Sequence, residues 1–138
     1  MIAGLVALVL LAIAGLHAAW ALRATWPAAD ETALARMVVG SSGIQRMPSV
    51  AACWAVVGAL LIVALLTLAK GGWIADPAPG LTSLLLAGSA AIFGIRGIAS
   101  WIPAWRALCP EEPFATLDRR YYGPLCLALG LGQLAVLI

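Results

Sequence analysis

The stretch from Phe114 to Cys126 reads FATLDRRYYGPLC, and it is the densest polar passage in an otherwise apolar chain. It leads directly into the last apolar segment, and its Pro124 suits the first turn of a helix. The 15 residues from this proline to the C-terminus give only about 22 Å of helix, too short to cross roughly 30 Å of hydrocarbon. We therefore predict a membrane-spanning helix over residues 117–138 that starts near Asp118. We expect it to be kinked at Pro124, where the carbonyl of Arg120 loses its usual hydrogen bond.

The composition indicates that lipid is the solvent of this protein. Of the 138 residues 64% are hydrophobic and only 10% are charged, whereas ordinary soluble domains are about 25% charged. A chain of this length has room for one domain. Its net charge of +2 and the absence of any long basic run argue against a nucleic-acid partner.

Three further segments are long and apolar enough to cross a membrane, namely residues 2–22, 48–69 and 81–102. Pro48 suits the first turn of the second segment. Backbone groups in lipid must be hydrogen-bonded within their own segment, so each span must be a helix. No lysine or arginine precedes the first segment, which favours a retained span over a signal peptide. The sequence therefore predicts one all-α domain over residues 1–138, an integral membrane four-helix bundle.

The connections between these segments differ in length and charge. In the long first connection we expect a short surface helix, capped by Asp30 and ended by Gly40. The second connection holds a single basic residue, Lys70, whereas the first and third share six arginines: Arg23, Arg36, Arg46, Arg106, Arg119 and Arg120. Positive charge stays cytoplasmic. We therefore expect a multi-pass protein of the bacterial inner membrane, with both termini outside and the arginine-rich connections in the cytoplasm.

The cysteines and the single histidine exclude several chemistries. Cys53, Cys109 and Cys126 form no Cys-x-x-Cys pair, so a thiol redox centre is not expected. One histidine is too few for a haem or a metal centre, and we predict no metal site. No nucleophile elbow or phosphate loop is present. Cys109 lies in a connection, where we expect it to react quickly with thiol reagents, while the other two cysteines should react slowly.

The polar residues of the apolar segments lie at one depth. His17 and Arg96 each lie near the loop-side end of their segments, and Asp118 opens the fourth segment from the same side. Residues three or four apart share a helix face, as His17 and Trp20 do. The pattern predicts a polar, aromatic pocket near the cytoplasmic side. Its ligand-binding residues would be His17, Trp20, Arg96, Asp118, Tyr121 and Tyr122.

Each of these residues also has a purely structural interpretation. Arg96 could extend toward the headgroups, although a charge within a span usually faces the bundle interior and finds a partner. We expect Arg96 to pair with Asp118 or with the freed carbonyl of Arg120. Asp118 could cap a helix, and His17 could be a hydrogen-bonded packing residue. Aromatic residues near this surface are also typical of a membrane belt, to which we assign most of Trp20, Trp26, Trp54, Trp101, Trp105 and the tyrosines.

Two motifs resemble those of a known family. LHAAWAL over residues 16–22, together with FATLD over 114–118 and YGPLC over 122–126, is similar to the four-span bacterial family DUF3995. Family members often continue with glycines after the tryptophan motif, where this chain has Arg23-Ala24. The resemblance supports a four-span fold and singles out His17, Trp20, Asp118, Tyr122 and Pro124. It implies no activity, because the family has no known function.

Three functions remain open at this point. The pocket could bind a small amphipathic molecule or a lipid, which is the interpretation we favour. A membrane-embedded enzyme could use acid–base chemistry of His17, Asp118 and a tyrosine. A structural or accessory subunit could keep the charged pair merely for assembly. The expected partners are membrane lipid and an amphipathic small molecule; the cofactor is unknown, and a homo-oligomer is compatible with the sequence.

Overall fold

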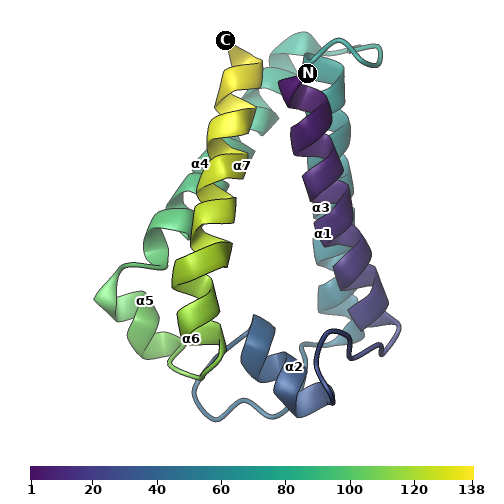
Figure 1. The fold of residues 1–138 in the computed structure, drawn as a ribbon. Coiled ribbons are helices and arrows are strands. Elements are labelled where there is room, and N and C mark those ends of the chain that lie inside the picture. The colour runs from purple at the N-terminus through teal and green to yellow at the C-terminus, as the bar shows by residue number, and fades with distance from the viewer.

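A computed structural model describes all residues from 1 to 138, and it is helical throughout, with no strand. Four of the helices are longer than the others (Figure 1). They are α1 (Ile2–Ala21), α3 (Val50–Lys70), α4 (Pro79–Ala99) and α7 (Gly123–Leu137). Shorter helical segments lie in the connections: α2 (Glu31–Val38), α5 (Pro103–Leu108), α6 (Phe114–Leu117) and a π turn, η1 (Asp118–Tyr122). The all-α prediction is confirmed.

Three of these helices, α1, α3 and α4, are long and apolar enough to cross a membrane, as in a multi-pass membrane protein. Their ends lie within three residues of the predicted ends. Pro48 was expected inside the second span, but α3 begins at Val50. The side chain of Ser49 caps it, accepting a hydrogen bond from the Ala52 N–H at 3.1 Å. Pro79 instead lies at the start of α4, two residues before the predicted beginning.

The predicted fourth span over residues 117–138 is divided in the structure, and α7 is not among the helices that are long enough to cross a membrane. α7 has only 15 residues, but α6 and η1 lead into it without a break. The Gly123 N–H donates to the Asp118 carbonyl, five residues back, which defines the π turn. The irregularity predicted at Pro124 is therefore a wider turn that ends just before it. Proline has no N–H, so Pro124 cannot donate the usual α-helical hydrogen bond to the carbonyl four residues back. The wider turn lies where this bond is missing.

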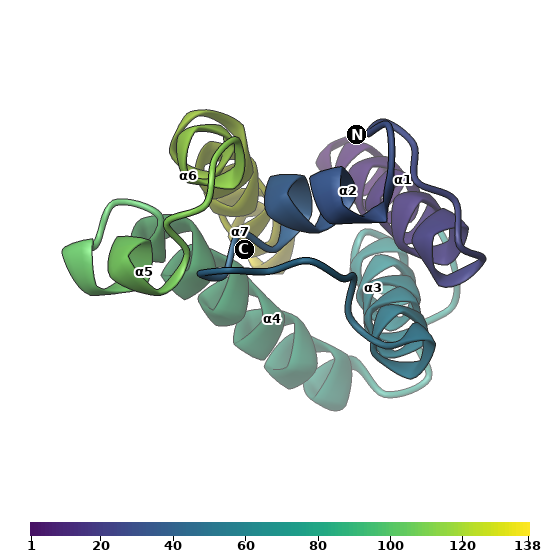
Figure 2. The ribbon, with the colours of Figure 1, turned by 90° about the horizontal axis from the view of Figure 1, so that it is seen from below.

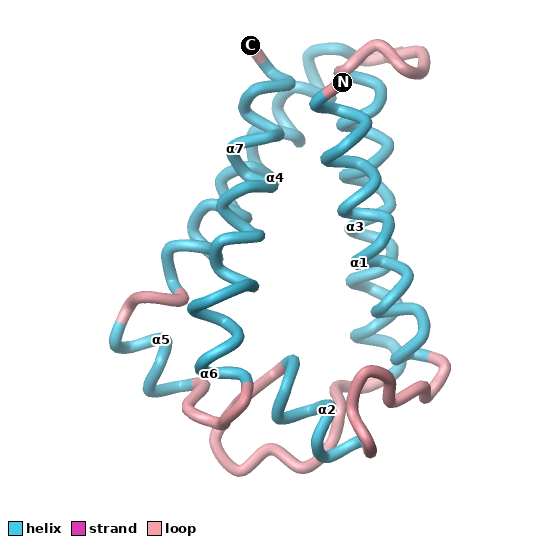
Figure 3. The backbone as a smooth tube through the Cα atoms, in the orientation of Figure 1, coloured by secondary structure: helices cyan, strands magenta, loops and turns pink.

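The long helices form two pairs, α1 with α3 and α4 with α7. The pairs approach each other at the end that holds both termini and diverge toward the opposite end (Figures 1 and 3). Seen from below, α2 lies across this wider end (Figure 2). The main buried cluster belongs mostly to the first pair and includes one residue of the second: Val6, Ala7, Leu10, Ala14, Val57, Leu60, Ala64 and Leu129.

Small residues allow close contact between α4 and α7. A Cβ atom on Gly97 would lie 2.9 Å from the Gly123 carbonyl oxygen, and one on Gly130 would lie 3.0 Å from the Ala90 carbonyl oxygen. The two backbones therefore approach within the distance that only glycine permits, as in other closely packed membrane helices. This contact holds the end of α4 directly against the start of α7.

The first connection folds as its sequence predicts. The Asp30 carboxylate accepts a hydrogen bond from the Ala33 N–H at 2.8 Å and caps α2. Gly40 follows the helix with a φ of +70°, and a Cβ atom there would collide with the ring of Phe114. Leu34, on the buried face of α2, is fully covered. These contacts attach the first connection to α6, in the third connection.

Candidate functional site

The carboxylate of Asp118 is the centre of the polar cluster. The residue is only 3% exposed, and both of its carboxylate oxygens accept hydrogen bonds. Arg96 Nη2 donates to Oδ1 at 2.6 Å, and Trp105 Nε1 donates to Oδ2 at 3.0 Å. Arg96 therefore faces inward and pairs with Asp118, as predicted. The Asp118 side chain caps no helix N-terminus and is instead a buried charge with a cationic and a neutral donor.

Trp105 completes this cluster in a second way. Its ring lies under the Arg96 guanidinium, with Cζ 4.8 Å from the ring centroid, a distance that allows a cation–π interaction. Sequence reasoning missed this role and grouped Trp105 with the aromatic belt. It also missed α5, which carries Trp105 and begins at Pro103. A proline followed by helix-forming residues was the available signal for the helix, but no sequence pattern identifies the partner of its tryptophan.

Local packing explains why Arg96 and Asp118 meet. Gly123 has no side chain, and a Cβ atom there would collide with Ser100 Oγ. The end of α4 can therefore lie directly against the π turn that carries Asp118. Ser100 satisfies its own hydroxyl by donating to the Gly97 carbonyl at 2.7 Å. The Arg96 and Asp118 side chains can then pair across this contact.

One polar atom of the cluster has no partner. Arg96 Nη1 is buried and makes no hydrogen bond, although the Arg96 side chain as a whole is 29% exposed. A buried donor without an acceptor costs about 1–3 kcal/mol. The Asp118 carboxylate does not relieve this, because Arg96 donates to it through Nη2 and not through Nη1.

The two tyrosines have different environments. The Tyr122 hydroxyl donates to the Met37 carbonyl at 3.2 Å, and its ring lies 5.9 Å from that of Phe114. Tyr122 thus joins η1 to α2. Tyr121 is 53% exposed and lies against the guanidinium of Arg120 instead. The structure attaches Tyr122 to α2 and leaves Tyr121 on the surface, contrary to the predicted grouping.

His17 and Trp20 lie on the other helix pair. Their ring centroids are 4.9 Å apart. His17 Nδ1 is hydrogen-bonded to the Ile13 carbonyl at 2.9 Å, and Trp20 Nε1 donates to the Trp26 carbonyl at 2.9 Å. No hydrogen bond joins His17 to Asp118 or to either tyrosine. The predicted residues lie at a similar depth along their helices, but they do not all meet, because the helix pairs diverge at this end (Figure 3).

His17 nevertheless continues the buried face of α1. The other residues of that face are buried, namely Leu10, Ala14 and Ala21. His17 lies between Ala14 and Ala21, and each residue of this series is three or four positions from the next. His17 itself is only partly buried. Trp20 also lines a cavity of about 70 Å³ beside Glu31 and Met47, under the loop-side end of α1.

Cys109 corrects another expectation. It lies in a connection, as predicted, but it is only 9% exposed. The third connection folds against the first, because the Glu111 N–H donates to the Gly40 carbonyl at 3.1 Å and the Gly43 N–H donates to Glu111 Oε1 at 2.9 Å. Burial raises the pKa of the Cys109 thiol, and the Asp118 carboxylate raises it further. Rapid reaction of this thiol is therefore no longer expected.

Comparison with known proteins yields one match. The family model described as "Protein of unknown function (DUF3995)" matches residues 10–133. No curated protein and no solved structure matches the chain. The matched range contains the whole Asp118 cluster as well as His17 and Trp20. The chain therefore belongs to the DUF3995 family of proteins of unknown function.

Proposed function

We propose that the protein is a four-span protein of the bacterial inner membrane with its arginine-rich connections in the cytoplasm. The continuous helix from Phe114 to Leu137 supports a fourth crossing, because its three segments together give on the order of 30 Å. Both chain ends lie at the same end of the bundle, as an even number of crossings requires (Figure 1). The distribution of arginines supports the orientation.

We further propose that the wide end of the bundle binds a small amphipathic molecule or a lipid between the two helix pairs. The observation that carries this proposal is the buried, unpaired Nη1 of Arg96. A carbonyl, carboxylate or phosphate oxygen of a ligand would accept a hydrogen bond from it. Such an acceptor would remove the penalty of an unsatisfied buried donor.

The two helix pairs would supply the two walls of this site. Arg96, Asp118 and Tyr122 belong to one wall. His17 and Trp20 would form the opposite wall, since His17 follows the inner face of α1 and its Nε2 has no hydrogen bond within the protein. Tyr121 is the one predicted residue that this arrangement omits.

The apolar part of the ligand has a surface to follow. Phe93 lies three residues before Arg96 on α4, so the two side chains share a helix face. Phe93 packs against the central buried cluster. A head group at Arg96 would therefore leave the apolar portion directed along Phe93 toward the bundle core.

Native mass spectrometry of the purified protein tests this function. We expect the wild type to retain a bound molecule, and Arg96→Gln and His17→Gln to lose most of it. Arg46→Gln is the matched control, because Arg46 is exposed and has no partner in the structure. Repeated wild-type preparations without any bound molecule, or equal retention by all variants, would refute the proposal.

A structural or accessory subunit is the second candidate. It is favoured by the Asp118 carboxylate, because both of its oxygens already accept a hydrogen bond within the protein. In that case Arg96→Gln should weaken folding or assembly, while preparations of the wild type would carry no stoichiometric ligand.

A further inference from the structure

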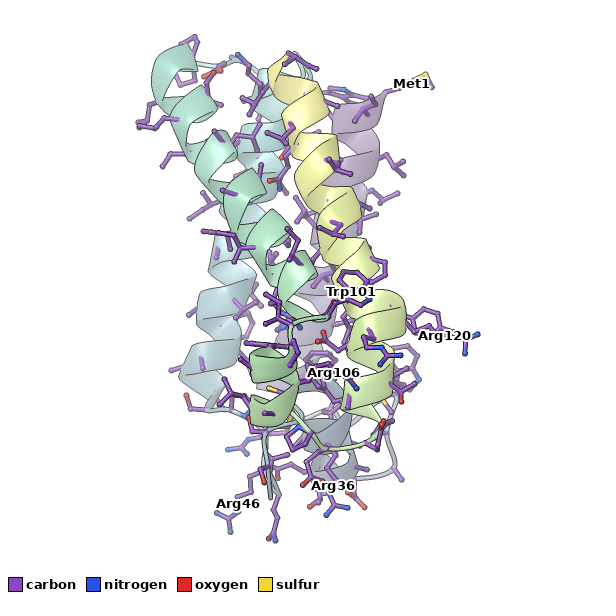
Figure 4. The ribbon with its side chains drawn as sticks, turned by 90° about the vertical axis from the view of Figure 1, so that its left-hand side faces the viewer. Met1, Arg36, Arg46, Trp101, Arg106 and Arg120 are labelled. Carbon is purple, nitrogen blue, oxygen red and sulfur yellow. The ribbon has the colours of Figure 1, made fainter.

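A second polar site lies outside the Asp118 cluster, in a surface hollow between α5 and the α6–η1 segment. The hollow has a volume of about 620 Å³. Its charged and aromatic lining consists of Trp101, Arg106, Glu112, Arg119 and Arg120. Figure 4 shows Trp101, Arg106 and Arg120 on this face of the molecule. We call this feature the arginine hollow.

The arginine hollow has an excess of positive charge that the protein does not balance. Three arginine residues line it, against one acidic residue, Glu112, and the guanidinium of one of them, Arg120, also lies over the ring of Tyr121. The Glu112 oxygens accept hydrogen bonds from Thr116, from its N–H at 3.1 Å and from its hydroxyl at 3.0 Å. The only Arg–carboxylate pairs in the structure are Arg36–Glu111 and Arg96–Asp118. No acidic side chain therefore pairs with any arginine of the hollow.

The chemistry of the hollow matches a phosphate group. Guanidinium groups bind phosphate oxygens through paired, charge-assisted hydrogen bonds. Arg106 comes from α5, while Arg119 and Arg120 come from η1, so an anion in the hollow would be contacted from two elements. A phosphodiester, with its single negative charge, would offset part of the net positive charge of the lining.

The surroundings of the hollow favour a phosphate that belongs to a lipid. Trp101 is 46% exposed and follows the end of α4, a position typical of a tryptophan at the membrane interface. Ile98 and Ile102, on either side of it in sequence, are also exposed and apolar. In the proposed orientation the hollow lies at the cytoplasmic headgroup level, where anionic lipids and clustered arginines attract each other.

We infer that the arginine hollow is a binding site for the phosphate headgroup of an anionic lipid. The site uses neither Arg96 nor Asp118, so it is separate from the ligand site proposed between the helix pairs. Arg106 and Arg119 bind the phosphate from opposite elements, and Trp101 contacts the glycerol region beside it. The exposed isoleucines contact the start of the acyl chains.

The test compares lipid retention by full-length variants of equal net charge. The protein is incorporated into nanodiscs of mixed phosphatidylglycerol and phosphatidylcholine, and retained lipid is measured by native mass spectrometry after release into detergent. The hollow variant is Arg106→Gln/Arg119→Gln. The control is Arg23→Gln/Arg46→Gln, which removes two exposed arginines from the same side of the bundle without touching the hollow.

We expect the wild type to retain phosphatidylglycerol in preference to phosphatidylcholine. The hollow variant should retain about tenfold less phosphatidylglycerol, since each arginine adds to the attraction between the protein and the anionic headgroup. Retention by the control should change less than about twofold. Equal loss in both double variants, or no loss in either, would overturn the inference. Glu112→Gln removes the one negative charge of the hollow and should increase retention, and a decrease would count against the site.

Inorganic phosphate distinguishes the two sources of the ligand. It is added at millimolar concentration to wild-type protein in nanodiscs of pure phosphatidylcholine, with binding measured by equilibrium dialysis. Weak binding of inorganic phosphate that vanishes in the hollow variant, together with the expected retention of phosphatidylglycerol, supports a lipid headgroup as the physiological source of the bound phosphate. Strong phosphate binding without any preference for phosphatidylglycerol would overturn the lipid assignment. Loss of lipid from Arg96→Gln but not from the hollow variant would locate lipid binding only at the site between the helix pairs.

Discussion

Removal of Arg96 should destabilise the protein more than neutralisation of its partner. Arg96→Met leaves the Asp118 carboxylate, whose side chain is 4% exposed, with Trp105 as its single donor. An uncompensated buried charge typically costs about 3–5 kcal/mol. Asp118→Asn keeps an acceptor for one donor and leaves the positive charge on a side chain that is 29% exposed. Because a long arginine can extend toward water, we expect a smaller loss of about 1–3 kcal/mol.

The double variant isolates the interaction between the two side chains. With both charges removed, neither residue leaves an unpaired charge behind. Arg96→Met/Asp118→Asn should therefore lose less stability than the sum of the single variants, by at least about 1 kcal/mol. The measurement is reversible unfolding by sodium dodecyl sulfate in mixed micelles, followed by circular dichroism.

Arg46→Met is the control for loss of an arginine on the same side of the bundle. Arg46 is exposed and unpaired, so its replacement should change the free energy of unfolding by less than about 0.5 kcal/mol. Additive effects of the two single variants would show that Arg96 and Asp118 do not interact. An Arg96→Met variant no less stable than Arg46→Met would refute the buried pair altogether.

Three further predictions test other parts of the structure. Cys109 should react more slowly with a maleimide at pH 8 than a free thiol does, because its raised pKa lowers the thiolate fraction at that pH and burial limits access; reaction at the rate of a free thiol would contradict its burial. Gly123→Ala should cost about 1–3 kcal/mol in the same unfolding assay, because the added methyl group collides with Ser100. Gly88→Ala, where a Cβ meets nothing within 4 Å, should be neutral or stabilise by up to about 1 kcal/mol, and equal effects would exclude the close contact. His17→Gln should weaken binding of the co-purified molecule by about 1–3 kcal/mol while thermal stability stays near that of the wild type, whereas lost stability with unchanged binding would make His17 a packing residue.

The helical elements could be predicted because their causes are local. Hydropathy over about 20 residues predicted α1, α3 and α4 to within a few residues, since backbone groups in lipid leave only the helix as a spanning structure. The cap at Asp30 and the end of α2 before Gly40 depend on neighbouring backbone groups alone. Inward-facing Arg96 also followed from a local cost, that of an unpaired charge in a membrane segment.

The composition of the candidate site depended on contacts between elements far apart in sequence. Depth along a helix is a local property, and it correctly placed His17 and Asp118 near the same end of the bundle. Which helices are neighbours at that depth is not local. The close α4–α7 contact at Gly97 and Gly123 joins Arg96 to Asp118, while the divergence of the helix pairs leaves His17 on the other side.

Trp105 and Cys109 illustrate the same limit. Both lie in a connection whose sequence is typical of an exposed, polar segment at the membrane surface. Trp105 donates to Asp118 because α5 folds back toward the π turn, and Cys109 is buried because the third connection hydrogen-bonds to the first at Gly40. The sequence by itself determined that a charged residue in span three needs a partner. Only the tertiary structure decided that the partner is Asp118, supported by Trp105, because those contacts join segments whose approach depends on packing of the whole chain.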